Sequence, residues 1–124
     1  MKALIGSIIF LLSSALTHAV TLKDARLWAA PDRTRIVFDV SSKIKYRVFA
    51  IERRNGKPFR IVIDMEHTLV SSRLVGKEFN KGLVQRIRSG RLPKSGLRIV
   101  LDLKGSANPR SFVLGPSGPY GHRL

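Results

Sequence analysis

Three hexapeptides of one pattern decide the fold of this chain: Arg35-Ile36-Val37-Phe38-Asp39-Val40, Arg60-Ile61-Val62-Ile63-Asp64-Met65 and Arg98-Ile99-Val100-Leu101-Asp102-Leu103. Each reads Arg-Ile-Val-apolar-Asp-apolar, and β-branched runs of this kind favour strands. Successive side chains of a strand point to opposite faces, so one face of each strand is apolar and the other carries Arg, Val and Asp. The apolar faces must be buried, and antiparallel neighbours let aspartate and arginine pair across the other face. We therefore interpret the three aspartates as charge-balancing residues and not as catalytic carboxylates.

Turn signals between these repeats predict hairpins. Asn55-Gly56 is the strongest of them, since both residues accept positive φ, and it joins a strand at residues 46–51 to one at residues 59–65. A turn at Asp32-Arg33, after a proline, joins residues 25–30 to the first repeat. The connections therefore predict antiparallel pairing.

The rest of the chain fits a mostly β fold. Residues 83–88 predict a strand that ends at Ser89-Gly90 and is followed by a turn before Leu97, and residues 69–79 predict a short helix or a loop. His122 begins another strand where the sequence stops, so we expect the last strand to be truncated. About seven or eight short strands favour an all-β fold, a β-sandwich of two similar sheets.

Length and composition exclude several classes of protein. The 124 residues suffice for one compact domain, and a hydrophobic content of 44% is too high for a disordered basic tail. The absence of cysteine excludes a disulfide framework, a thiolate metal site and a cysteine nucleophile. The 23 Lys and Arg residues against 8 Asp and Glu give a net charge of +15, which indicates a polyanionic partner.

The first nineteen residues predict which polyanion is available. Met1-Lys2 and an apolar run over residues 3–12 precede Thr17-His18-Ala19, a small-residue cleavage site, as in a secretory signal peptide. The run is shorter than the roughly 20 residues of a membrane-spanning helix. We therefore expect a periplasmic chain cleaved after Ala19, with a single domain over residues 20–124 and no membrane span. Export disfavours nucleic acid and favours wall carboxylates, acidic polysaccharide or lipid phosphate.

The candidate binding residues are clustered cations and aromatic rings. The cations are Lys43, Lys45, Arg47, Arg53, Arg54, Lys57, Arg86, Arg88, Arg91, Lys94 and Arg98. Lys43, Lys45 and Arg47 are spaced to share one strand face, as are Arg86 and Arg88, and arginine binds carboxylates bidentately. Trp28, Tyr46 and Tyr120 are candidates for stacking on sugar rings. The alternatives are a solvated basic surface without a partner and a tryptophan that anchors the core.

The chain lacks the residues of a hydrolase. Beyond the signal peptide it has two histidines, His67 and His122, which are far apart in the sequence, and no His-Glu-x-x-His or Gly-x-Ser-x-Gly motif. We interpret His67 as a loop or strand-end residue. The sequence therefore predicts a chain that is not an enzyme and has no metal site or cofactor.

Five segments resemble the AMIN domain, which stands at the N-terminus of periplasmic N-acetylmuramoyl-L-alanine amidases. They occur in the expected order over nearly all of the chain beyond the signal peptide: Val20 to Trp28, Ala30 to Asp39, Phe59 to Asp64, Ile87 to Gly90 and Leu97 to Leu103. The resemblance implies a sandwich of two similar sheets that binds peptidoglycan and directs its enzyme to the division septum. Peptidoglycan is the expected partner, and septal division proteins are a second candidate.

The same resemblance predicts what the chain lacks. It ends where the family continues into a linker and a zinc-dependent catalytic domain, so we expect the domain to be incomplete and zinc to belong only to the missing part. AMIN domains also occur in outer-membrane secretins of pilus systems. The alternative function is therefore a protein-interaction module of a pilus or secretion secretin.

Overall fold

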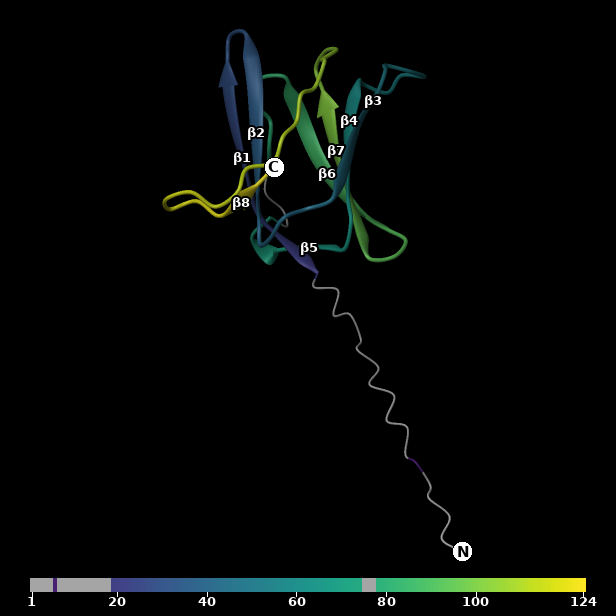
Figure 1. Cartoon of the computed structure of the whole chain (residues 1–124). Coiled ribbons are helices and arrows are strands. Elements are labelled where there is room, and N and C mark those ends of the chain that lie inside the picture. The colour runs from purple at the N-terminus through teal and green to yellow at the C-terminus, as the bar shows by residue number, and fades with distance from the viewer. Residues whose placement is uncertain (1–5, 7–18, 75–77) are drawn as a thin grey trace, which may run out of the picture.

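The described part of the chain forms two β-sheets. The computed structural model describes residues 6, 19–74 and 78–124. Apart from residues 6 and 19, the predicted signal peptide lies outside the described residues. Sheet A has the strand order β5-β1-β2-β8 and sheet B has the order β3-β4-β7-β6, and the two face each other (Figure 1). No α-helix occurs in these residues. The predicted all-β fold with two similar sheets is confirmed.

The strands have these bounds: β1 Val20–Ala30, β2 Arg33–Val40, β3 Tyr46–Ile51, β4 Arg60–Met65, β5 Thr68–Val70, β6 Val84–Leu92, β7 Gly96–Leu103 and β8 His122–Arg123. A single turn of 3-10 helix follows β5 at Ser72–Leu74. The three repeats are β2, β4 and β7, so one lies in sheet A and two are the central strands of sheet B. All pairs are antiparallel except β1 with β5, which is parallel.

The apolar faces of the repeats form the core between the sheets. Eight of their nine predicted residues are buried in one cluster, namely Phe38, Val40, Ile61, Ile63, Met65, Ile99, Leu101 and Leu103, and Ile36 packs against it partly buried. The opposite faces are less exposed than the sequence predicted, because Val37 and Val62 are also buried there. In the strand register Val62 lies between Phe49 and Val100, and Val37 lies opposite Arg26.

The hairpin at Asn55-Gly56 is confirmed, with φ angles of 51° and 74° for these two residues. The β1–β2 turn lies at Pro31 and Asp32, one residue earlier than predicted, and Arg33 already pairs with Ala30.

The strand end predicted at Ser89-Gly90 is wrong, whereas the turn predicted before Leu97 is confirmed. Both residues lie inside β6 and pair with Ile99 and Arg98 of β7. The strands continue to Leu92, and the chain reverses at Pro93 to Ser95, where Lys94 and Ser95 have φ angles of 60° and 61°. Two adjacent residues with positive φ form the tight turn that suits the twist of a hairpin, even without the usual Asn-Gly pair.

A short hairpin just before Leu124 extends sheet A. Residues 114–123, which we call the C-terminal arm, fold into a hairpin through the bridges of Leu114 with Arg123 and Ser117 with Tyr120. Its second limb contains β8, which pairs with β2, and the arm projects sideways from the sheet (Figure 1). The strand predicted to begin at His122 is confirmed, and its truncation stays a prediction.

Candidate functional site

The outer face of sheet B carries arginines that converge on two aspartates. Arg98 donates two hydrogen bonds, of 2.7 and 2.8 Å, to the carboxylate of Asp64, and Arg47 contacts the same group at 3.4 Å. Both arginines also lie over the ring of Phe49. The guanidinium carbon of Arg47 is 4.9 Å from the ring centre and that of Arg98 is 5.7 Å from it. The cross-strand register places these side chains together, because Asp64 is opposite Arg47 on β3 and opposite Arg98 on β7.

Asp102 is the second such centre and is more deeply buried, with 2% of its surface exposed. Arg88 donates two hydrogen bonds of 2.9 Å to its carboxylate, and Arg86 donates a third of 3.0 Å. Arg86 and Arg88 share a face of β6, as their spacing predicted. The predicted cross-strand pairing of aspartate with arginine is therefore confirmed for Asp64 and Asp102.

These contacts lower the pKa of both carboxyls. For Asp64 the hydrogen bond from Arg98 is the main cause, and it outweighs the opposing effect of burial. Burial is the largest single influence on Asp102 and raises its pKa, but the hydrogen bonds from Arg88 and Arg86 together prevail. Both groups are therefore ionised at neutral pH and do not serve as proton donors there.

The outer face of sheet A combines arginine with exposed aromatic rings. Arg26 donates two hydrogen bonds of 2.8 Å to Asp39, the repeat aspartate of β2. Its guanidinium lies 5.3 Å from the ring centres of both Trp28 and Tyr120, and Arg123 lies 5.0 Å from the Tyr120 ring. Trp28 is 47% exposed, so it stands on the surface and does not anchor the core.

A hollow of about 550 Å³ lies on this face, and we call it the aromatic groove. The side chains that define it are Trp28, Tyr120, Arg26, Arg33, Arg35 and Arg123. Trp28 and Arg35 are opposite each other in the β1–β2 register, and the C-terminal arm adds Tyr120 and Arg123. Buried Val37 lines the groove between them.

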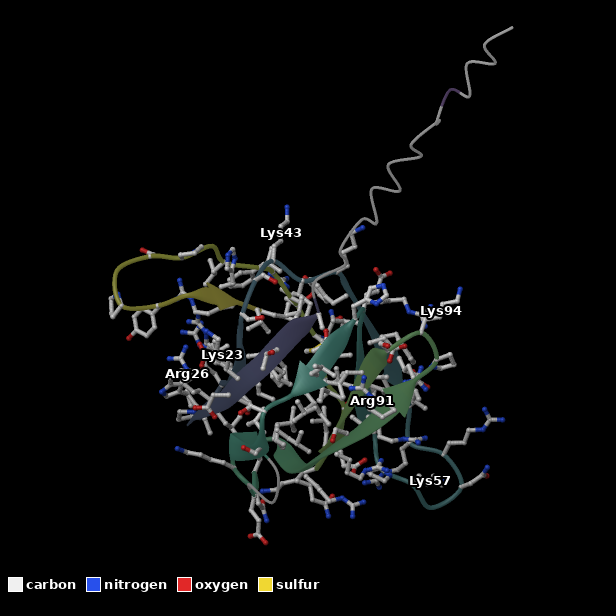
Figure 2. The ribbon with its side chains drawn as sticks, turned by 90° about the horizontal axis from the view of Figure 1, so that it is seen from below. Lys23, Arg26, Lys43, Lys57, Arg91 and Lys94 are labelled. Atoms are coloured by element: carbon white, nitrogen blue, oxygen red, sulfur yellow. The ribbon has the colours of Figure 1, made fainter. Side chains whose placement is uncertain are left out.

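The other predicted cations are dispersed over the surface. Lys43 and Lys45 lie exposed on either side of buried Ile44 in the connection before β3, so they are not in the same strand as Arg47. Arg53, Arg54 and Lys57 surround the β3–β4 turn. Arg91 donates to the backbone oxygens of Thr68 and Ser95. Lys43, Lys57 and Lys94 stand at separate points of the outline in Figure 2.

Sequence reasoning missed four residues of the aromatic groove: Arg26, Arg33, Arg35 and Arg123. A hairpin centred between Pro31 and Asp32 pairs Trp28 with Arg35, whereas the predicted turn at Asp32-Arg33 would have placed Trp28 opposite Val37. Arg123 lies in the strand predicted to begin at His122, but no local signal indicated that this strand pairs with β2 beside Arg26.

The described residues contain no group of three or more His, Asp or Glu side chains placed to hold a metal ion. His67 lies in the turn between β4 and β5 with a φ of 44°, so its prediction as a loop or strand-end residue is confirmed. Tyr46, another predicted aromatic, donates its hydroxyl to the Ser111 hydroxyl at 3.2 Å and packs against the core. Within residues 6, 19–74 and 78–124 there is also no helix with the length and apolarity needed to cross a bilayer.

Together these features define a basic β-sandwich module whose outer faces carry arginine-aspartate pairs and one aromatic groove. The chain belongs to the AMIN domain family, whose model matches residues 24–124. The predicted family is thereby confirmed.

Curated relatives extend this comparison. The chain is 28% identical over 103 residues to the N-acetylmuramoyl-L-alanine amidase AmiC of Escherichia coli O6:H1, a match that covers 80% of this chain and 24% of that protein. It is 27% identical over 104 residues to the amidase of the same name from Neisseria meningitidis serogroup B, covering 81% of this chain and 24% of that protein. The chain thus spans about a quarter of the length of these relatives.

Proposed function

We propose that this chain is a periplasmic module that binds peptidoglycan and directs an N-acetylmuramoyl-L-alanine amidase to the division septum, without catalytic activity of its own. Cleavage after Ala19 by a signal peptidase is part of this proposal. The amidase relatives and the AMIN family support the link to the wall. Zinc belongs to the catalytic part of such an enzyme, and this chain itself takes no cofactor.

The observation that supports the proposal is that the described ion pairs involve only a minority of the lysine and arginine residues. Those pairs involve three aspartates, Asp39, Asp64 and Asp102, and five arginines. With 23 basic against 8 acidic residues in the chain, a large positive surface is left for a partner. The candidate cations outside those pairs remain part of this surface: Lys43, Lys45, Arg53, Arg54, Lys57, Arg91 and Lys94. Stem-peptide carboxylates are the matching groups of peptidoglycan, and no nucleic acid is required.

Sedimentation with purified sacculi tests the binding. We expect the purified chain to pellet with sacculi at low ionic strength and to be released by added salt, because salt screens exposed charges. Sacculi whose carboxyl groups have been amidated serve as the matched control and should retain much less protein. Recovery of folded protein in the supernatant at low salt would contradict the proposal.

Two further measurements test targeting and the absence of catalysis. A fluorescent fusion exported to the periplasm should concentrate at constriction sites, and a uniform signal around the cell would count against targeting. The chain should release no stem peptides from sacculi when zinc is added, and soluble peptide in that assay would overturn the non-enzymatic assignment.

A further inference from the structure

The two outer faces of the sandwich differ in how their arginines are used. On sheet B, Asp64 and Asp102 accept hydrogen bonds from Arg47, Arg86, Arg88 and Arg98. The one aromatic ring there, Phe49, is covered by two of these arginines. Four arginines of this face are therefore paired within the fold, whereas Arg60 forms no ion pair with the described residues and its buried Nε has no hydrogen-bond partner. The face offers little open aromatic surface.

The aromatic groove on sheet A is different because most of its cations lack a carboxylate. Arg26 is engaged by Asp39. Arg33 and Arg35 are exposed and make no ion pair with any described residue. Arg123 donates only to the backbone oxygens of Gly115 and Gly121, at 3.3 and 3.2 Å. Among the described residues no acidic side chain lines the groove, so the charges of Arg33, Arg35 and Arg123 are not compensated by a carboxylate there.

The rings in the groove are also available to a ligand. Trp28 and Tyr120 are 47% and 48% exposed even though Arg26 lies near both rings and Arg123 lies near Tyr120 as well. Phe49 of sheet B is only partly exposed. Large aromatic side chains left half exposed on a rigid surface supply contact area at little cost in conformational entropy. The C–H faces of a pyranose ring stack on such rings, and a carboxylate close to the sugar pairs with a guanidinium.

We propose that the aromatic groove binds peptidoglycan at a sugar that carries a stem peptide. The sugar ring lies against Trp28 and Tyr120, and a peptide carboxylate pairs with Arg33 and Arg35. This inference rests on the proposed function and assigns the recognition to sheet A, leaving sheet B as a structural face. It requires the ligand to present both a sugar and an adjacent negative charge.

Trp28 is the one tryptophan of the chain, so its fluorescence reports on the groove directly. Titration with a soluble disaccharide-peptide fragment should change the Trp28 emission and saturate. We expect the disaccharide alone and the peptide alone each to bind about tenfold more weakly, since each keeps half of the contacts. Arg35→Gln should weaken the complete fragment about tenfold, whereas Arg110→Gln, which removes an exposed arginine outside the groove, should not.

Sedimentation with sacculi separates failure of this inference from failure of the proposed function. Trp28→Ala should lower the bound fraction, and Phe112→Ala, which removes another exposed aromatic ring, should leave it unchanged. Circular dichroism verifies that each variant is folded. If the unaltered chain binds sacculi but Trp28→Ala and Arg35→Gln bind equally well, the groove assignment is wrong while wall binding stands. If vesicles of anionic lipid change the Trp28 emission and the fragment does not, the ligand assignment is overturned.

Discussion

Arg98 donates two hydrogen bonds to the carboxylate of Asp64 and thereby joins β7 to β4 across the outer face of sheet B. The pair is not isolated, since Arg47 of β3 reaches the same carboxylate from the other side. The Asp64 side chain thus connects three neighbouring strands, and its contribution to the free energy of unfolding can be measured.

Replacing Asp64 with asparagine should lower the free energy of unfolding by about 1–3 kcal/mol, because two guanidinium groups lose their charged acceptor. Urea titration followed by circular dichroism measures the change. Asp32→Asn is the matched control, since Asp32 is exposed in the β1–β2 turn and makes no ion pair with the described residues. Equal effects of the two substitutions would show that the Asp64 contacts contribute nothing.

Acid should destabilise the domain through Asp64 and Asp102. Their pKa values are lower in the folded state than the ordinary value of 3.8, so their contribution to stability is fully present above that value. It is lost as the pH falls through the lowered folded values. We expect the urea midpoint to fall when the pH is taken below about 4. An Asp64→Asn, Asp102→Asn double variant should show a shallower acid-induced decline, and an unchanged slope would refute this origin.

Gly82 is a sensitive position because it has no room for a side chain. A Cβ built there would lie 2.6 Å from the Ala29 Cβ and 2.7 Å from the Thr34 Oγ1, and φ is +57°. Gly56 also has a positive φ, of 74°, but has nothing within 4 Å. Both alanine variants incur the backbone strain, and only Gly82→Ala incurs the clash. We expect the free energy of unfolding, measured by urea titration, to be about 1–3 kcal/mol lower for Gly82→Ala than for Gly56→Ala. If the two variants unfold with the same free energy, the β1–β2 hairpin around Ala29 and Thr34 moves enough to accommodate the added methyl group.

The β6–β7 turn holds strain that sequence changes can relieve. Lys94 and Ser95 adopt left-handed backbone angles, which cost an ordinary residue about 1–2 kcal/mol relative to glycine. Changing them together to Asn-Gly should stabilise the domain by about 1 kcal/mol and raise the melting temperature. Scanning calorimetry measures this. The Lys94→Ala, Ser95→Ala variant keeps the strained angles and should show no gain, so a rise there would assign the effect to charge.

Much of the fold could be predicted because strand periodicity is local. The Arg-Ile-Val-apolar-Asp-apolar repeat gives both the core residues and the pairing of aspartate with arginine, and Asn55-Gly56 gives a hairpin. The end of β6 could not be placed, since Ser89-Gly90 has the composition of a turn and only pairing with β7 keeps it extended. Composition alone does not reveal such long-range pairing.

The candidate site was predictable only in part. Trp28 was identified, but its exposure depends on which face of β1 meets sheet B. Tyr120 reaches the groove through the C-terminal arm, a contact between distant parts of the chain that no spacing rule describes. The dense basic clusters were predicted to bind the partner, but Arg86 and Arg88 form ion pairs with Asp102.

Sheet B ends on both sides in a strand that carries arginine, Arg47 on β3 and Arg86, Arg88 and Arg91 on β6. The outermost strand of a sheet has unpaired backbone groups that can add a strand from another molecule, and cations there oppose this. Arg47, Arg86 and Arg88, which pair with Asp64 and Asp102, therefore also place positive charge on the edge strands, where it disfavours edge-to-edge pairing. Copies of the domain crowded on one polymer would stay separate molecules instead of joining into a continuous sheet.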